Sequence, residues 1–202
     1  LDAARKVAIM ASIAFNSRVV LDDVYVEGIT KLTAEDIAYA TEMGYTIKLL
    51  GVARHSENDG IEVRVHPMLI PSAHPLATVN DSFNAVFVHG DAVDDVMFYG
   101  RGAGELPTAS AVVGDVMDIA RNIQYNCKGR IRCTCYKEIP IKSINECRSS
   151  YFIRMQAQNR PGVLANIASA FGMCNVSIAQ FVQKNVQDDV AEMVEQVENL
   201  LL

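Results

Sequence analysis

Apolar residues recur at helical spacing in three parts of the chain. Residues 1–15 carry a broad apolar face, which predicts a buried helix. Residues 34–42 follow Thr33, a favoured N-cap, and precede Gly44, a residue favoured just after a helix end. Residues 109–122 repeat the helical spacing and predict a third helix.

The apolar runs between these helices predict strands. Residues 45–54 and 61–67 flank a polar turn that ends in Asp-Gly, and residues 83–89 and 93–99 flank a Gly-Asp pair. Each pair is therefore expected to form a β-hairpin. Residues 24–29 add a short extended piece. Four strands in hairpins, flanked by three helices, predict an α+β sheet layer.

The last quarter of the chain has its own pattern. Residues 151–157 alternate and predict a strand, and a turn at 159–162 leads into a helix over 163–173. Residues 175–183 predict a second strand. Residues 188–202 have apolar positions at helical spacing and predict a final amphipathic helix.

Bulk composition excludes two classes of partner. Half of the 202 residues are hydrophobic and 21% are charged, which is typical of a well-packed soluble protein. The formal net charge of −6 provides no basic surface for a nucleic acid. No apolar run approaches the roughly 18 residues that span a bilayer. We therefore expect a cytoplasmic protein that binds neither nucleic acid nor membranes.

Four of the five cysteines lie in residues 127–147. Zinc sites favour two C-x-x-C pairs, whereas this segment has one C-x-C and no histidine follows residue 90. An odd number of cysteines without a secretory signal favours free thiols in a reducing compartment. We therefore expect no bound metal.

Residues 97–115 carry the most informative motif. An apolar run ends at a glycine-rich turn, residues 100–104, and Pro107 opens the helical pattern that follows. Glycines let a ligand approach the backbone, and a helix start offers free N–H groups to an anion. This order predicts a loop that contacts a cofactor, although most glycine-rich turns are ordinary turns.

The dinucleotide-binding fingerprint itself is absent. G-x-G-x-x-G would need a glycine where Glu105 stands, and the sequence has no P-loop. The chain also starts at Leu1 inside a helical pattern, with no N-cap before it. We therefore expect a piece of a longer protein, in which a nucleotide-binding domain outside this chain faces the loop.

Several separate motifs, in the correct order, resemble the homoserine dehydrogenase family. D-x-x-x-K at residues 2–6 is similar to the end of the family signature, and G-Y-T-I-K-L-L at 44–50 is similar to a family strand. H-P-M-L-I-P at 66–71 and H-P-L-A at 74–77 resemble a further family segment. The loop and helix start at 100–109 are similar to the family's G-x-G-A-G-x-x-P-T-A. Several ordered matches are far more specific than any one of them.

The resemblance implies an oxidoreductase that interconverts L-homoserine and L-aspartate 4-semialdehyde with NAD or NADP, on the route to threonine, methionine and isoleucine. It implies that Lys6 transfers the proton of the substrate hydroxyl and that Asp2 helps to hold the substrate. It also implies that Gly104 contacts the cofactor, supported by Gly102 and Ala103. A lysine needs a lowered pKa to act as a base at neutral pH, whereas a charged lysine can donate its proton in the reverse reaction.

Simpler interpretations stand beside these roles. Asp2 and Lys6 are four residues apart on a predicted helix and match an ordinary surface ion pair, worth roughly 0.3–0.5 kcal/mol. Arg101 is expected to be solvated rather than bound to a phosphate. His74 is expected to be structural, and Lys48 to reach from an apolar strand to the surface.

From residue 151 the chain resembles an ACT domain, a small ferredoxin-like module that senses amino acids, with its turn at 159–164. The resemblance implies an effector site at Asn159, Gly162 and Asn175, with threonine as the effector by analogy. The alternative is a dimerisation element without a ligand. A complete ACT domain is βαββαβ, and the predicted pattern lacks its third and fourth strands, so we expect the domain to be incomplete.

The expected architecture is α+β: a helix-flanked sheet of the homoserine dehydrogenase catalytic domain in 1–126, a linker in 127–149 and an incomplete ferredoxin-like ACT domain in 150–202. We expect a homodimer or a higher homo-oligomer. Lys6 and Gly104 are expected to converge on one cleft. The competing interpretation is a non-catalytic module that binds amino acids or drives oligomerisation.

Overall fold

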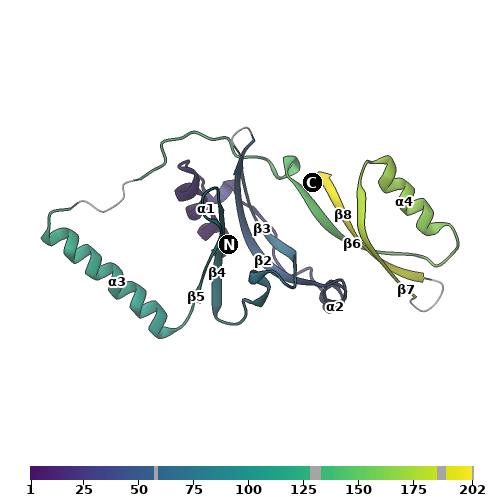
Figure 1. The fold of residues 1–202 in the computed structure, drawn as a ribbon, viewed down its shortest axis with the longest axis horizontal. Helices are drawn as coiled ribbons and strands as arrows, with labels where there is room; N and C mark the ends of the chain where they lie inside the picture. Colours follow the sequence, from purple (N-terminus) through teal and green to yellow (C-terminus); the bar gives the residue numbers. More distant parts are fainter. Residues whose placement is uncertain (57–58, 128–132, 186–189, 202) are drawn as a thin grey trace.

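The computed structural model describes residues 1–56, 59–127, 133–185 and 190–201. Within these ranges the chain mixes helices with strands that form three separate sheets (Figure 1). α3, Glu105–Gln124, lies at one end of the ribbon, and α4, Val163–Met173, lies at the other.

The central sheet has the strand order β1-β3-β2. β2, Tyr45–Ser56, pairs antiparallel with β3, Gly60–Pro71, and β1, Tyr25–Val26, runs parallel to β3. α1, Asp2–Phe15, packs on one face of this sheet. The shared core consists of Ala4, Val7, Ala8, Ala11, Val19, Val24, Ile61, Val63 and Val65. Each large side chain buried here contributes roughly 1.5–3 kcal/mol.

α2, Ala34–Glu42, has the predicted bounds. The Thr33 hydroxyl accepts a hydrogen bond from the Asp36 N–H at 3.2 Å, and the Asp36 carboxylate accepts one from the Thr33 N–H at 2.8 Å. This reciprocal capping box satisfies two backbone donors at the helix start. Gly44 follows with φ +83°, a left-handed conformation that ends the helix.

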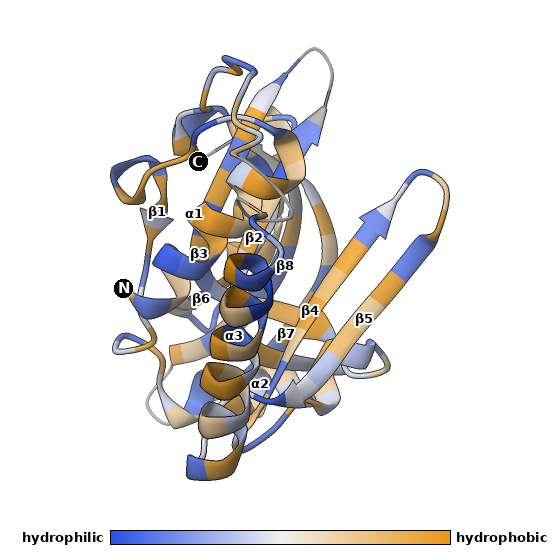
Figure 2. Cartoon of the chain, turned by 90° about the vertical axis from the view of Figure 1, so that its left-hand side faces the viewer, coloured by the Kyte–Doolittle hydropathy of each residue, from blue (hydrophilic) through white to orange (hydrophobic). Residues whose placement is uncertain are grey.

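The predicted hairpins are both present, but the prediction of one four-stranded layer is wrong. β4, Phe83–Gly90, and β5, Asp94–Arg101, form a two-stranded sheet of their own. The segment before β4, which contains the short helix η2, Pro75–Thr78, contacts both β2 and β3. Lys48 Nζ on β2 donates to Val79 O at 2.6 Å and so fastens this segment. The hairpin projects away from the central sheet (Figure 2).

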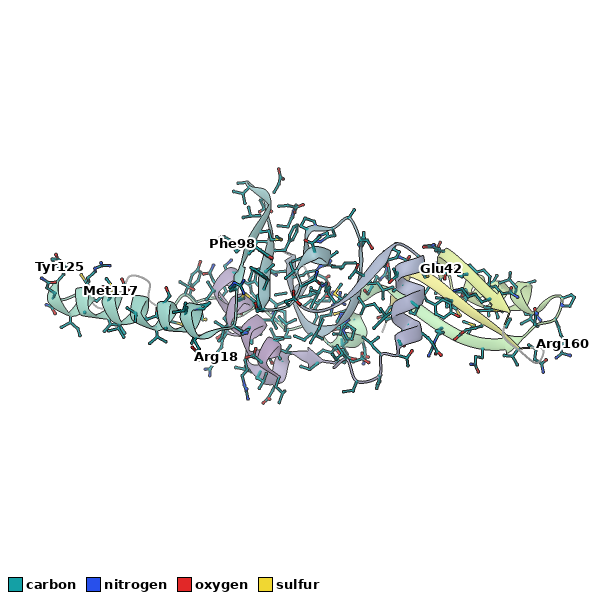
Figure 3. The ribbon with its side chains drawn as sticks, turned by 90° about the horizontal axis from the view of Figure 1, so that it is seen from below. Arg18, Glu42, Phe98, Met117, Tyr125 and Arg160 are labelled. Carbon is teal, nitrogen blue, oxygen red and sulfur yellow. The ribbon has the colours of Figure 1, made fainter. Side chains whose placement is uncertain are left out.

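α3 begins at Glu105, four residues before the predicted start. Pro107 lies in its first turn, where the missing N–H has no consequence because no intrahelical acceptor faces that position. No residue of α3 is buried, so this helix covers no sheet and the expectation of three flanking helices fails for it. Met117 and Tyr125 extend from α3 well away from the rest of the chain (Figure 3).

The C-terminal unit is a three-stranded sheet with the order β6-β8-β7 and one helix, α4. β6, Arg148–Gln158, and β7, Ser177–Asn185, both pair antiparallel with β8, Val190–Leu201, and do not pair with each other. The helix over 163–173 is as predicted.

The predicted final helix over 188–202 is wrong, because residues 190–201 form the central strand β8. The apolar positions of this segment fit a helix, but Ala191, Met193 and Val197 also lie at alternate positions on one face, as a strand requires. β8 gains hydrogen-bonded neighbours on both edges, which outweighs a local helical preference. The third strand expected to be missing is therefore present. Positions 186–189 and 202 lie outside the described residues.

The segment between the units has no strand of its own in its described part, residues 133–147. It makes isolated bridges from Lys137 to Ser17 and from Ile141 to Ile61, and one short helix, η3, Ile144–Glu146. The Ile61 N–H donates to Pro140 O and the Lys142 N–H donates to Ile61 O, both at 2.8 Å. The segment therefore runs along the end of β3.

Two classes of feature are not found in the part of the chain that the structure describes. No described helix is long and apolar enough to cross a membrane. No three described His, Cys, Asp or Glu side chains are grouped so that they could hold a metal ion.

Candidate active site

Asp2 and Lys6 lie one turn apart on the outward face of α1. Lys6 Nζ is 2.8 Å from Asp2 Oδ2, and the side chains of Lys6 and Asp2 are 63% and 80% exposed. The hydrogen bond and the charge of Lys6 hold the pKa of the Asp2 carboxyl below its usual value. Because Val7 and Ala8 turn the other face of α1 into the core, the pair is presented outward.

The outward face of α1 continues as an apolar stripe. Ile9 and Ile13 follow Asp2 by seven and eleven positions, which places them on the same side of a helix with 3.6 residues per turn. They are 61% and 67% exposed. A charged pair at the head of an exposed apolar stripe is typical of a surface that receives another molecule or domain.

The backbone conformation of the glycine-rich loop itself favours glycine. Gly104 is the N-cap of α3 with φ 124° and ψ 154°, a region that is essentially restricted to glycine. The Gly102 N–H donates to Ser82 O at 3.0 Å, and a Cβ at position 102 would collide with the Asn84 side chain. Ala103 links the two glycines. Glycine is thus needed at 104 whether or not a cofactor binds there, whereas a side chain at 102 would require the exposed Asn84 side chain to move.

The polar residues near the loop and η2 make internal contacts. The Arg101 guanidinium lies 4.8 Å from the centre of the Phe83 ring and donates to Ser82 Oγ at 3.1 Å. His74 Nδ1 accepts a hydrogen bond from the Leu76 N–H at 3.2 Å, and its ring centre lies 4.9 Å from that of Phe87. These contacts agree with a structural role for His74, and Arg101 makes its contacts while it stays exposed to solvent, as expected.

The Lys48 ammonium donates to Val79 O at 2.6 Å in a half-buried contact and to Asn80 Oδ1 at 2.8 Å in an exposed one. Lys6 and the loop at 100–104 are not joined by any hydrogen bond, ion pair or ring contact given by the described residues. Their convergence on one cleft stays a prediction.

The three predicted effector residues surround α4 but do not form one cluster. Gly162 is the N-cap of α4 with φ 90°, and Asn159 Oδ1, just before it, accepts a hydrogen bond from Gln183 Nε2 at 3.3 Å. Asn175 follows the other end of α4 in a left-handed conformation, φ 57°. An eleven-residue helix is about 16 Å long, so Asn175 is distant from the other two.

The role of Asn175 in the fold is clear. Its N–H donates to Gly172 O, and the N–H of Val176 donates to Phe171 O, both at 3.0 Å. Together these bonds form the Schellman motif that closes a helix, in which asparagine tolerates the left-handed position. The local structure therefore accounts for Asn175 without a ligand.

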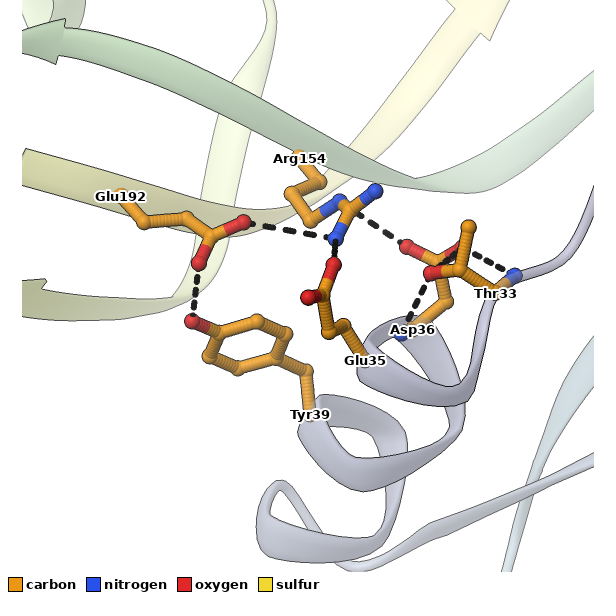
Figure 4. A network of polar contacts seen from close by, with 6 residues as sticks. All are labelled: Thr33, Glu35, Asp36, Tyr39, Arg154 and Glu192. Atoms are coloured by element: carbon orange, nitrogen blue, oxygen red, sulfur yellow. Dashed lines mark hydrogen bonds and ion pairs between the residues drawn. The ribbon is translucent and has the colours of Figure 1, made fainter. Parts of the chain in front are cut away.

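Sequence analysis missed a charged network between α2 and the C-terminal sheet (Figure 4). Arg154 on β6 pairs with Glu35 at 2.7 Å, Asp36 at 3.0 Å and Glu192 at 3.4 Å. The Tyr39 hydroxyl donates to Glu192 Oε2 at 2.6 Å, which raises the pKa of Tyr39 to about 12. Below the network, Tyr39 and Met43 pack on the buried Val194 of β8. The charged network and this apolar contact together hold the C-terminal unit against α2.

A second missed cluster lies on the face of β3 opposite α1. Arg64 Nη1 is 3.1 Å from Glu62 Oε1, and the two residues are 1% and 9% exposed. Burial raises the pKa of the Cys147 thiol and of the Tyr151 hydroxyl, which border this pair. Charged residues at alternate positions of the apolar run 61–67 were the available sequence signal. Beside the cluster, a hollow of about 200 Å³ is lined by Asp22, Asp23, Val24, Tyr25, Val63, Lys142, Ser143, Ile144 and Cys147.

Comparison with known proteins agrees with the motifs. Residues 1–117 match the family model described as homoserine dehydrogenase. The homoserine dehydrogenase of Corynebacterium glutamicum is 46% identical over 197 residues, covering 96% of this chain and 44% of that protein. The homoserine dehydrogenase of Pseudomonas aeruginosa is 44% identical over 201 residues, covering 96% of this chain and 46% of that protein. The chain thus spans about half the length of the curated relatives it matches.

Solved structures extend the match to the whole fold. The crystal structure of a homoserine dehydrogenase from Thiobacillus denitrificans superimposes with a TM-score of 0.89 at 40% identity, over 99% of this chain and 46% of that one. A Staphylococcus aureus homoserine dehydrogenase crystallised at pH 7.0 gives a TM-score of 0.69 at 33% identity. The resemblance found in the sequence motifs is confirmed, and the chain belongs to the homoserine dehydrogenase family.

Proposed function

We propose that this chain supplies the substrate-binding and catalytic part of an NAD(P)-dependent homoserine dehydrogenase. Such an oxidoreductase interconverts L-homoserine and L-aspartate 4-semialdehyde in the biosynthesis of threonine, methionine and isoleucine. The observation that carries the proposal is the outward-facing pair Asp2 and Lys6, which lies in the family-matched segment at the head of an exposed apolar stripe.

The chemistry of alcohol oxidation explains the need for these two side chains. The hydroxyl proton has to leave as the carbon gives up its hydride, so a proton acceptor must contact the hydroxyl oxygen. We assign this role to Lys6 Nζ, which takes the proton in oxidation and returns it in reduction. Asp2 binds the ammonium group of the substrate, and that contact competes with Lys6 for the carboxylate and frees Lys6 Nζ.

The loop 100–104 fits a nicotinamide cofactor, NAD or NADP, at Gly104 with Gly102 and Ala103. The cofactor, when bound, supplies the hydride acceptor. A Cβ at Gly100 would meet no atom within 4 Å, and Gly100 has no positive φ, so the chain itself does not need glycine there. Glycine inside a strand weakens it and often marks the close approach of a ligand. The first N–H groups of α3 add donors for an anionic group.

The test is Lys6→Ala in the intact enzyme that contains this segment. Loss of the proton acceptor should lower kcat by about 10²–10⁴-fold, with a smaller change in KM. Lys31→Ala is the matched control, because Lys31 also pairs with an acid four residues away, Glu27, at 3.7 Å on the surface. Near-normal turnover of the Lys6 variant would remove Lys6 from the mechanism.

For the C-terminal part we propose an incomplete ferredoxin-like ACT domain over 150–202, joined by the linker 127–149 to the catalytic domain over 1–126. Three features support it: the order β6-α4-β7-β8 along the chain, the sheet order β6-β8-β7, and the turn at 159–164. The elements β6, α4, β7 and β8 correspond to the first four elements of βαββαβ. We assign its effector, threonine by analogy, to the end of α4 at Asn159 and Gly162, with Asn175 contributing only from a second copy in a homodimer or higher homo-oligomer.

A second candidate function is a sensing or oligomerisation module without catalysis, which the C-terminal sheet alone would favour. Titration of L-threonine into the chain, followed by thermal unfolding, separates sensing from oligomerisation. If the chain binds threonine as an effector, Tm should rise with the threonine concentration. An unchanged Tm together with a concentration-dependent increase in mass by light scattering would support oligomerisation alone. We place the enzyme in the cytoplasm, in keeping with the free thiols of all five cysteines.

A further inference from the structure

α2 is a short helix whose large buried side chains face the C-terminal unit. Tyr39 and the C-cap residue Met43 are each 7% exposed and pack on Val194 of β8. Ala40 is the other buried residue of α2, and Ile37 is exposed. The helix has nine residues, and isolated helices shorter than about 12–15 residues are marginal in water. Packing against the C-terminal sheet, rather than the length of the helix, is therefore the main source of its order.

Each strand of the C-terminal sheet also places a charged side chain against α2. These side chains are Arg154 on β6, Lys184 on β7 and Glu192 on β8. Arg154 and Glu192 hold the first two turns of the helix (Figure 4), where the Asp36 carboxylate serves both Arg154 and the capping box. Lys184 pairs with Glu42 in the last turn, and its ammonium lies 4.7 Å from the centre of the Tyr39 ring. The sheet therefore contacts α2 along its whole length.

α2 leads directly into β2 of the central sheet. Gly44 follows the helix in a left-handed conformation, and its carbonyl accepts a hydrogen bond from the Ser72 N–H at 2.9 Å. Tyr45, the first residue of β2, packs in the same apolar cluster as Tyr39, together with Phe152 of β6. A displacement of the C-terminal sheet therefore acts on α2 and on the start of β2 together.

We propose that α2 is a coupling helix, ordered by the docked C-terminal sheet and able to carry the state of that sheet to β2. Docking and helix formation are then one equilibrium, in which α2 is ordered where the sheet is in place and frays where the sheet moves away. The regulatory meaning rests on the proposed function, in which residues 150–202 bind an effector and residues 1–126 hold the catalytic residues. The dependence of α2 on the sheet rests on the contacts alone.

Hydrogen–deuterium exchange followed by mass spectrometry measures the order of α2 in the whole chain. Arg154→Met removes the cation that Asp36 and Glu192 share. It should speed exchange in peptides that cover α2 by about tenfold or more, while α1 and α4 exchange as in the wild type. Lys142→Met is the matched control, because Lys142 pairs with Asp59 at 2.6 Å and has no ion pair with α2 in the described structure. It should leave exchange in α2 unchanged.

Glu42→Lys separates docking from the intrinsic stability of the helix. A cation in the last turn interacts favourably with the helix dipole, so a helix that is stable by itself would exchange more slowly. Docking predicts faster exchange, because two ammonium groups would then face each other at the place of the pair between Glu42 and Lys184. Adding Lys184→Glu restores an opposite-charge pair and should recover part of the lost protection. Both side chains are half exposed, so these variants should still fold.

Three results would overturn the dependence of α2 on the sheet. The first is wild-type exchange of α2 in Arg154→Met, and the second is slower exchange in Glu42→Lys. The third is an equal loss of protection in α1, α2 and α4, which would show that α2 has no separate equilibrium.

The regulatory part is tested in the intact enzyme with L-threonine as the probe. Arg154→Met should bind threonine with a Kd within about threefold of the wild type, while the change of kcat on binding falls by about fivefold or more. A variant that binds threonine and keeps the full response overturns the regulatory part. A wild type that does not bind threonine contradicts the proposed effector instead, and the exchange measurements, made without any ligand, still decide the coupling.

Discussion

Replacing Glu195 with leucine should make the chain more stable. Glu195 lies in the middle of the central strand β8, opposite Ile153 on β6 and Phe181 on β7, and is 0% exposed. Neither carboxyl oxygen has a hydrogen-bond partner in the described structure. Val194 next to it packs on α2, so Glu195 points into the opposite face of the sheet.

The magnitude follows from the missing partners. A buried polar group without a hydrogen bond costs about 1–3 kcal/mol of folding free energy. Leucine removes that penalty and adds apolar surface to the same site, at the expense of a modest change of shape. We therefore expect Glu195→Leu to raise the free energy of unfolding by about 1–3 kcal/mol at neutral pH.

The effect should depend on pH. Burial raises the pKa of the Glu195 carboxyl in the folded chain above its value in the unfolded chain. The folded state then binds this proton more tightly than the unfolded state. Protonation of Glu195 therefore stabilises the wild-type fold fully below the unfolded pKa, and this contribution is lost as pH rises through the folded pKa. Glu195→Gln, which cannot ionise, should remove this part of the decline in stability as pH rises above the unfolded pKa of the carboxyl.

Urea unfolding followed by far-UV circular dichroism measures both effects, since the chain has no tryptophan to report by fluorescence. Glu192→Gln is the matched control on the same strand, because the Glu192 carboxylate is paired with Arg154 and Tyr39 and should lose stability when neutralised. The reasoning is refuted if Glu195→Leu is less stable than the wild type at neutral pH, or if Glu195→Gln keeps the wild-type pH dependence.

Two further pairs of substitutions test other parts of the structure. Gly104→Ala should lower the free energy of unfolding by about 1–3 kcal/mol, because a residue with a Cβ is strained at φ 124°. Gly100→Ala, with open space around it, should change the free energy of unfolding by less than about 1 kcal/mol. Equal losses for the two variants in urea unfolding would contradict this. Arg154→Met should cost about 2–3 kcal/mol because it leaves half-buried carboxylates of α2 and β8 unpaired, and Arg154→Lys should recover part of the loss, as measured by thermal unfolding. A methionine variant as stable as the wild type would show that the network contributes little.

Local signals in the sequence predicted most elements well. Thr33 and Gly44 mark the two ends of α2 by side-chain and backbone chemistry that acts within a few residues, and the turn before Val163 marks the start of α4. The D-x-x-x-K pair also follows from spacing alone, since residues four apart on a helix are neighbours.

The features that sequence analysis missed depend on contacts between distant residues. Residues 190–201 fit a helix or a strand by their apolar pattern, and only β6 and β7 on either side decide for the strand. Arg154 is 119 positions from Glu35 along the chain, so no local pattern announces their pairing. The formation of a separate sheet by β4 and β5 likewise has no local signal, because both predicted hairpins have the same alternating pattern.

The position of β8 sets the order in which the molecule can assemble during synthesis. The fully buried residues of the core around α1 and the central sheet all come from the first third of the chain, so this part can form while the ribosome is still translating the remainder. β6 and β7 cannot be joined until Val190 and the residues after it emerge, because β8 lies between them. Until then both strands expose unpaired edges, and a nascent chain stalled before Val190 should be a target for chaperones and aggregation.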